Sequence, residues 1–172
     1  TAPGLNYTKA VTVAVIDIMP PTVSSIYTKG NSVFLKFSES VTASSVPSSA
    51  FNVATVDSSN KATIRRISKI TLDSNDSTLV DLTLADAILG SDLNLKVSYA
   101  DPLGNQELGI IQDLAGNDAV SFGERYAETF ITASTTKLAS LYKNLLLIGT
   151  AAINGTGNSS NNNITGNESK NI

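Results

Sequence analysis

Six acidic or amide residues of this chain have side chains suited to binding a hard metal ion. All six follow predicted strands or lie in turn-like loops: Asp17, Glu39, Asp101, Asp113, Asn117 and Asp118. Calcium in proteins takes about six to eight oxygen ligands from carboxylates, amides, main-chain carbonyls and water. If the strand ends meet at one pole of the fold, these oxygens converge and form a calcium site. The alternative is that the Asp and Asn side chains only stabilise turns.

The same carboxylates are the groups that an enzyme would have to use here. The chain has no His and no Cys, which excludes the usual zinc, haem and iron–sulfur ligand sets, thiol nucleophiles and Ser-His relays. A glycosidase needs two carboxylates, and Glu39 with Asp113 or Asp101 would be that pair. No other feature of the sequence supports catalysis, so we expect a protein that is not an enzyme.

The composition is typical of β-rich modules in secreted or cell-surface proteins. The formal net charge is -3 and the 12 Lys and Arg residues are scattered, so the basic patch of a nucleic-acid-binding protein is missing. No run reaches the roughly 18 apolar residues of a membrane span. Charged residues make up only 16% of the chain, and 22 Ser, 18 Thr and 16 Asn supply the polar surface instead. We therefore expect a secreted or cell-surface location.

Alternating apolar and polar residues predict short strands through the middle of the chain. We expect these strands at 23–27, 33–38, 51–56, 64–72, 79–84, 93–99 and 128–133, with Val33, Leu35 and Phe37 on one face. About seven strands over roughly 110 residues are typical of an antiparallel immunoglobulin-like β-sandwich. A further strand at 11–17 precedes Pro20-Pro21, so residues 1–17 are predicted to be the end of a preceding module or a linker.

Five short motifs follow one another within the predicted sandwich. They are Pro20-Pro21, Phe37-Ser38-Glu39, Phe51-Asn52-Val53, Val97-Ser98-Tyr99-Ala100-Asp101-Pro102 and Asp113-Leu114-Ala115-Gly116-Asn117-Asp118-Ala119. In this order they resemble the SwmB-type bacterial immunoglobulin-like repeat, which occurs in long cyanobacterial and other bacterial surface proteins. The resemblance covers residues 18–133. It implies a β-sandwich that serves as a spacer or adhesive module without catalysis.

Residues 148–172 differ in kind, because they are rich in Asn, Gly and Ser. An offset of nine residues superimposes Gly157-Asn158 on Gly166-Asn167, Ser160 on Ser169 and Asn162 on Asn171. This repeat resembles the lead-in to the haemolysin-type, or RTX, parallel β-roll. RTX repeats bind calcium through Asp, but no Asp follows Asp118, so we expect a degenerate, metal-free start of a β-roll. The alternative is a disordered linker, because two turns bury little apolar surface.

Residues 134–147 connect the predicted sandwich to the predicted β-roll. Within them and nearby, Leu138, Leu141, Tyr142 and Leu145 recur at helical spacing. This spacing favours a short helix in the connector.

Together these features predict a structural or adhesive module of a large secreted or surface-attached bacterial protein. It would space and present neighbouring domains of the same chain, with calcium at module junctions and with cell-surface or extracellular matrix glycans or proteins as further partners. A carbohydrate-binding module is the alternative, and it would need an exposed aromatic strip with Tyr27, Tyr126 and Tyr142 as candidates. A carboxylate-based glycosidase is a more remote alternative.

Overall fold

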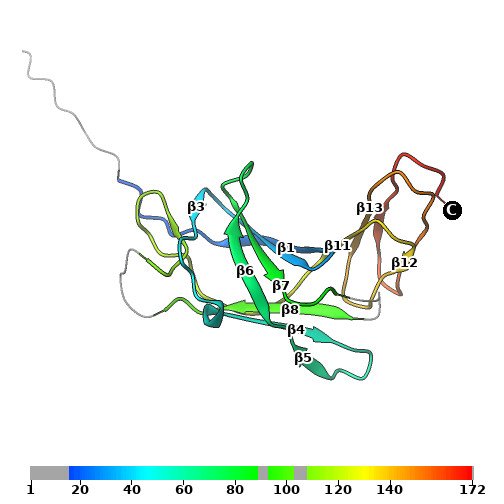
Figure 1. The fold of residues 1–172 in the computed structure, drawn as a ribbon, viewed down its shortest axis with the longest axis horizontal. Helices are drawn as coiled ribbons and strands as arrows, with labels where there is room; N and C mark the ends of the chain where they lie inside the picture. Colours follow the sequence, from blue (N-terminus) through cyan, green and yellow to red (C-terminus); the bar gives the residue numbers. More distant parts are fainter. Residues whose placement is uncertain (1–15, 89–92, 103–107, 172) are drawn as a thin grey trace, which may run out of the picture.

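The computed structural model describes residues 16–88, 93–102 and 108–171 (Figure 1). The predicted strand at 11–17 lies almost entirely outside the described residues, and Ile16 and Asp17 are not part of a strand. In the described part of the chain all regular structure is β-sheet, apart from one 3-10 turn, η1 (Ser48–Ala50). The predicted all-β class is confirmed.

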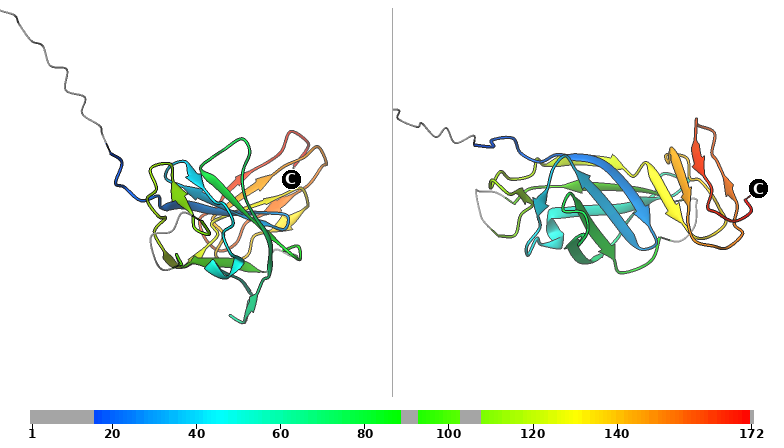
Figure 2. Two further views of the ribbon diagram at one scale, coloured as in Figure 1. Left: turned by 60° about the vertical axis from the view of Figure 1, so that its left-hand side comes forward. Right: turned by 90° about the horizontal axis from the view of Figure 1, so that it is seen from above.

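Two sheets form the sandwich (Figure 2). The larger sheet has the strand order β15-β13-β11-β1-β2-β7-β6, and its sandwich part holds β1 (Val23–Lys29), β2 (Ser32–Phe37), β6 (Ile67–Leu72) and β7 (Leu79–Leu84). The smaller sheet has the order β10-β8-β4-β5, with β4 (Phe51–Val56), β5 (Ala62–Ile64), β8 (Asn94–Tyr99) and β10 (Phe122–Tyr126). Neighbouring strands within these two groups are antiparallel.

Strand alternation places the core between the two sheets. Val33, Leu35 and Phe37 of β2 are 0%, 0% and 2% exposed, so the prediction that they share the buried face is confirmed. Leu95 and Val97 of β8 are fully buried from the other sheet. Because successive strand residues point to opposite faces, each of these strands turns one side to the core and the other outward.

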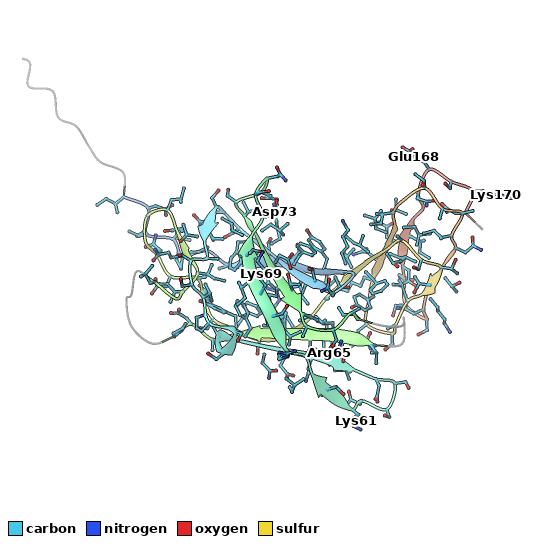
Figure 3. The ribbon with its side chains drawn as sticks, viewed as in Figure 1. Lys61, Arg65, Lys69, Asp73, Glu168 and Lys170 are labelled. Atoms are coloured by element: carbon cyan, nitrogen blue, oxygen red, sulfur yellow. The ribbon has the colours of Figure 1, made fainter. Side chains whose placement is uncertain are left out.

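The single strand predicted at 64–72 is wrong. The chain forms β5 and β6 instead, and these strands belong to different sheets. Arg65, which lies between them (Figure 3), donates its main-chain N–H to the Val53 carbonyl and its guanidinium to the carbonyls of Asp86 and Ala87. These hydrogen bonds hold the chain where it crosses from one sheet to the other, and apolar alternation alone does not reveal such a crossing.

The short helix expected within 134–147 is also wrong. The structure forms β12 (Thr136–Lys137), a turn and then β13 (Asn144–Leu147). Leu138 and Tyr142 are buried but Leu141 is 44% exposed, so the apolar residues do not share one helical face. Leu138, Tyr142 and Leu145 point into a strand-built interior, and the helical spacing arises from the turn between two short strands.

Strand β11 (Thr129–Thr132) joins the sandwich to a second kind of structure. It pairs with β1 on one side and with β13 on the other, both in parallel. β13 pairs in turn with β15 (Asn163–Thr165), again in parallel. The large sheet is therefore mixed rather than purely antiparallel, and it continues without interruption beyond the sandwich.

Residues 129–171 wind as a flattened parallel coil, which we call the coil stack (Figure 1). A second parallel ladder joins β12 to β14 (Gly155–Thr156), so the chain alternates between the two ladders. Thr136 pairs with Gly155 and Asn144 pairs with Asn163. Both steps span nineteen residues, so one coil corresponds to about two of the nine-residue units seen in the sequence.

The repeated Asn residues hold one coil onto the next. Asn158 Nδ2 donates to the carbonyls of Ala139 (2.7 Å) and Tyr142 (2.8 Å), one coil below. Nine residues later, Asn167 Nδ2 donates in the same way to the carbonyls of Gly149 (3.0 Å) and Ala151 (2.9 Å). The amide side chains thus satisfy main-chain carbonyls in the turns of the preceding coil, including the Ala139 carbonyl, which also accepts a longer hydrogen bond from the Tyr142 N–H (3.3 Å).

The structure also explains why a glycine precedes each of these Asn residues. A Cβ atom at Gly157 would overlap Asn162 Oδ1, and one at Gly166 would overlap Asn171 Oδ1. Asn162 Oδ1 instead accepts a hydrogen bond from the Asn158 N–H (2.8 Å). The Gly-Asn-x-Ser-x-Asn pattern therefore encodes a compact turn in which a second Asn side chain fills the space left by the glycine.

Tyr142 links the coil stack to the sandwich. It is 2% exposed, its ring packs edge-on against Phe130 at 5.4 Å, and its hydroxyl lies 3.3 Å from Thr28 Oγ1 of β1. Burial raises the pKa of Tyr142 to about 12. The buried apolar residues of the coil stack and of the sandwich belong to one cluster, so the two parts share a core.

Candidate functional site

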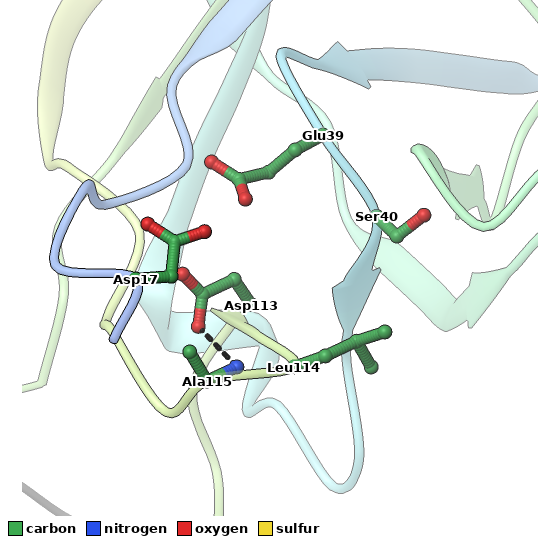
Figure 4. A pocket seen from close by; sticks show the side chains of 6 residues that line it. All are labelled: Asp17, Glu39, Ser40, Asp113, Leu114 and Ala115. Carbon is green, nitrogen blue, oxygen red and sulfur yellow. Dashed lines mark hydrogen bonds between the residues drawn. The ribbon is translucent and has the colours of Figure 1, made fainter. Parts of the chain in front are cut away.

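Three carboxylates converge at the pole of the sandwich that lies away from the coil stack (Figures 1 and 4). They belong to Asp17, Glu39 and Asp113, and one oxygen atom of each lies within 4.8 Å of the others. The side chains point toward one another across an open hollow of about 380 Å³, which is lined by Asp17, Glu39, Ser40, Asp113, Leu114 and Ala115.

Each carboxylate is brought to this pole by a different segment. Asp113 ends the short strand β9 (Gln112–Asp113), which pairs with β3 (Val41–Thr42). Glu39 lies in the bend between β2 and β3. Asp17 lies in the extended segment that leads into the sandwich, and its carbonyl accepts a hydrogen bond from Asn117 Nδ2 (3.2 Å). The hydrogen bond from Asn117 therefore ties the entering chain to the sandwich.

Asp113 is the most rigidly held of the three and is only 3% exposed. Its Oδ1 accepts hydrogen bonds from the N–H groups of Ala115 and Asn117 (both 2.8 Å), and its Oδ2 accepts one from Asn117 Nδ2 (2.7 Å). Burial alone would raise the pKa of Asp113, but these hydrogen bonds outweigh it and lower the pKa. The Asp113 carboxylate thus stays ionised in a buried position.

The environment of Glu39 shifts the pKa of its carboxyl group in the opposite direction. Desolvation and then the charges of Asp17 and Asp113 raise its pKa. Where the chain is described, the ion pairs join Lys36 to Asp76, Lys96 to Glu124 and Lys143 to Glu128, so no Lys or Arg neutralises the cluster. Three like charges without a counter-charge repel one another, and a bound cation would relieve that repulsion.

The other sequence-predicted donors take different places. Asn117 uses its side-chain N–H group to bridge Asp113 and the Asp17 carbonyl. Asp101 Oδ1 accepts a hydrogen bond from the Tyr99 hydroxyl (3.3 Å) and is not part of the three-carboxylate group. Asp118 is also outside that group, although its Oδ1 is buried without a hydrogen-bond partner. Burial and the charges of Asp101 and Asp113 raise the pKa of Asp118.

The geometry suits a hard cation better than glycoside hydrolysis. Carboxylate oxygens are the ligands that Ca²⁺ prefers, and the open side of the hollow leaves room for water ligands. As the nucleophile or base of a glycosidase pair, Asp113 would have to act while N–H donors hold both of its oxygens, whereas the remaining lone pairs of a carboxylate can still contact a cation. The described lining also contains no aromatic residue that would stack on a sugar.

The aromatic residues considered for carbohydrate binding are scattered. Tyr142 is buried in the shared core, which removes it as a sugar-stacking residue. Tyr27 and Phe34 stack at 4.8 Å with their rings 12° from parallel, and both are half-buried. Tyr126 is half-buried on β10 of the other sheet. A single aromatic pair is less than the predicted strip, and carbohydrate binding stays a prediction.

The sequence reasoning missed the neighbours that shape the hollow. Ser40 and Leu114 line it beside the acidic residues, and Leu114 is 79% exposed. The signal that was available is the five-residue loop Asp113-Leu-Ala-Gly-Asn117, in which Gly116 has a positive φ of 91°. That turn aims the Asn117 side chain back at Asp113.

The fold and the site define an all-β module with a carboxylate cluster at one pole and a parallel coil stack at the other. No family model and no curated protein matches the chain. Two solved structures are similar to part of it. Domains 1–6 of the surface layer protein SbsC match 66% of this chain with 13% identity and a TM-score of 0.48. The N-terminal part of the bacterial S-layer protein SbsC matches 65% of this chain with 14% identity and a TM-score of 0.45. The chain spans only 14% and 23% of those two chains.

At this level of similarity, the function has to be argued from the chain's own residues. The resemblances to SwmB-type repeats and to RTX rolls stay expectations, because no family model supports them. Among the described residues, no helix is long and apolar enough to cross a membrane.

Proposed function

We propose that this chain is a structural module of a larger secreted or cell-surface bacterial protein, in which it spaces and presents neighbouring domains. The observation that carries the proposal is the continuous seven-stranded sheet. Its main-chain hydrogen bonds join the sandwich to the coil stack through β1 and β11, without a linker. A module built in this way keeps its two poles at a fixed separation, and its polar Ser- and Thr-rich faces suit a spacer.

The rigidity of the module can be tested with spin labels, because the chain has no native Cys. We expect Ser44→Cys, next to β3, and Glu168→Cys, in the last turn of the coil stack, to give one narrow distance distribution in pulsed electron spin resonance. Both positions are exposed. The pair Ser44→Cys and Lys61→Cys, within the sandwich, is the control. A broad or two-peaked distribution for the pole-to-pole pair alone would contradict the spacer function.

The proposal extends to the carboxylate cluster, which we assign to a calcium ion at the junction with the entering chain. Asp17, Glu39 and Asp113 would supply the protein ligands, and three segments far apart in the sequence would then be fixed to one another. The support is the convergence of three carboxylates without a cationic side chain. A cation at this position would stiffen the joint between this module and the residues before it.

We expect calcium titration of the full chain to give a saturable heat and a raised melting temperature that a chelator reverses. Glu39→Gln removes one charged ligand and should weaken calcium binding by about tenfold or more. Asp86→Asn, which removes one charge at an exposed position outside the cluster, is the matched control and should leave binding unchanged. No heat and no shift would overturn the calcium assignment and leave the spacer function to the spin-label experiment.

A further inference from the structure

In the last described coil, an apolar register position is exposed that is buried in the coil before it. Phe130, Leu145 and Ile164 occupy the same register position on β11, β13 and β15. Leu145, which lies under the last coil, is 1% exposed, whereas Ile164 is 43% exposed. β15 is also the outermost strand of the seven-stranded sheet, so one edge of its main chain is unpaired.

The turns of the two coils differ in the same way, in the hydrogen bonding of their main-chain carbonyls. In the coil below, the carbonyls of Ala139 and Tyr142 accept hydrogen bonds from Asn158, and the carbonyl of Ile153 accepts one from Asn171 (2.8 Å). Within the described residues, no main-chain carbonyl of the turns 158–162 and 167–171 accepts a hydrogen bond. These turns thus offer the acceptors that a further set of Asn amides would satisfy.

We propose that the open end of the coil stack is an acceptor surface for a further parallel coil that carries the Gly-Asn-x-Ser-x-Asn pattern. The added coil would extend the β15 and β14 ladders by nineteen residues, cover Ile164, and place its Asn amides on the carbonyls of the turns 158–162 and 167–171. The added coil would continue the coil-to-coil interface already present in the chain, where each of these contacts occurs once.

A second copy of the chain fits this end less well. Two identical ends that met through a twofold axis would pair β15 with β15 in the antiparallel direction. The observed ladder is parallel, and each Asn-rich turn lies over a turn of the preceding coil. Both copies would also offer only carbonyl acceptors at this end, because the amides of Asn158 and Asn167 already donate to the coil below. The acceptor surface therefore selects a coil that continues in the same direction.

This inference goes beyond the spacer function and does not depend on the calcium site, because it uses only contacts within the coil stack. If the extension fails while the spin-label distances stay narrow, only this inference is lost. If the distances are broad, the spacer function fails, whatever the extension does.

The test is the full chain extended after Ile172 by a copy of residues 154–172, which continues the nineteen-residue register. We expect hydrogen exchange of the β15 main-chain amides to slow by about tenfold or more and the melting temperature to rise. The control is the same extension with its four pattern Asn residues, the copies of Asn158, Asn162, Asn167 and Asn171, replaced by Ala. It should leave both quantities unchanged.

Three results would overturn the proposal. The first is unchanged exchange of β15 in the extended chain. The second is equal protection by the Asn-to-Ala control, since the amide pattern would then be irrelevant. The third is a concentration-dependent dimer of the unextended chain that already protects β15, which sedimentation velocity would detect and which would make a second copy the occupant.

Discussion

Replacement of Tyr142 by Ala is expected to lower the free energy of unfolding by about 3–5 kcal/mol, the usual cost of removing a large buried aromatic side chain. The ring fills the junction between Phe130 and β1, and the hydroxyl contacts Thr28. Because Tyr142 belongs to the core shared by both parts, the cavity should loosen the coil stack from the sandwich. Urea unfolding measures the total loss of unfolding free energy, and hydrogen exchange shows which strands lose protection.

The expected pattern is a larger loss of protection in β13 than in β8. Tyr142→Phe is the matched control: it keeps the ring and removes only the hydroxyl, so it should cost about 0.5–1.5 kcal/mol. An equal loss of protection in both strands would contradict the expectation that the cavity loosens the coil stack from the sandwich.

The buried hydroxyl also predicts an alkaline effect. Burial raises the pKa of Tyr142 to about 12 from the ordinary value of 10.0. Between these values the unfolded chain releases the proton while the folded chain keeps it, so the stability falls as the pH rises through this range. Tyr142→Phe should reduce that dependence, and the part that persists is expected from Tyr99, whose pKa burial also raises to about 12, and from Tyr27, whose pKa burial raises as well.

Replacement of Asn158 by Ala is the second large effect, with an expected loss of about 2–4 kcal/mol in the coil stack. Its side chain donates to two carbonyls of the coil below and accepts from the Ser160 N–H (2.9 Å) and Asn162 Nδ2 (3.0 Å). Each hydrogen bond contributes about 0.5–1.5 kcal/mol, and without Asn158 the carbonyls of Ala139 and Tyr142 keep only the longer hydrogen bonds from the Tyr142 N–H (3.3 Å) and Asn162 Nδ2 (3.4 Å).

The measurement is urea unfolding together with hydrogen exchange of β13 and β15. Asn161→Ala is the control, because Asn161 lies in the same turn with an exposed side chain and should change little. Asn158→Asp keeps the size but loses both donors, so it should be at least as destabilising as Asn158→Ala. Similar stabilities for the Asn158 and Asn161 variants would show that the amide contacts contribute little.

The parts of the fold that follow from local sequence were predictable. Alternation in Val33, Leu35 and Phe37 identified the buried face of β2, and the chemical types of Asp17, Glu39 and Asp113 identified the residues that converge. Convergence itself was not predictable, because it depends on β3 pairing with β9 across about seventy residues. For the same reason Asp101 and Asp118 were considered equal to the others, although they lie outside the cluster.

The connection between the sandwich and the coil stack could not be predicted from the sequence for a related reason. The pairing of β1 with β11 joins Tyr27 to Thr129, and residues so distant in sequence leave no periodic signal. The nine-residue repeat of Gly157-Asn158 and Gly166-Asn167 was visible, but the reason for it lies in carbonyls of the preceding coil, whose own sequence differs. The helical spacing around Leu138 was misread because one short turn reproduces it.

The parallel pairing of β1 with β11 also sets the order in which the molecule can assemble. β11 needs β1 as its template, and β1 is secured only when β2, β7 and the facing sheet have packed against it. The sandwich strands β1 to β10 precede β11 and the coils in the chain, so the folded sandwich offers a finished edge to which the coils can be added. The slow, long-range step of folding is therefore confined to the sandwich, and the coils add by short nearest-neighbour closures from β11 towards β15.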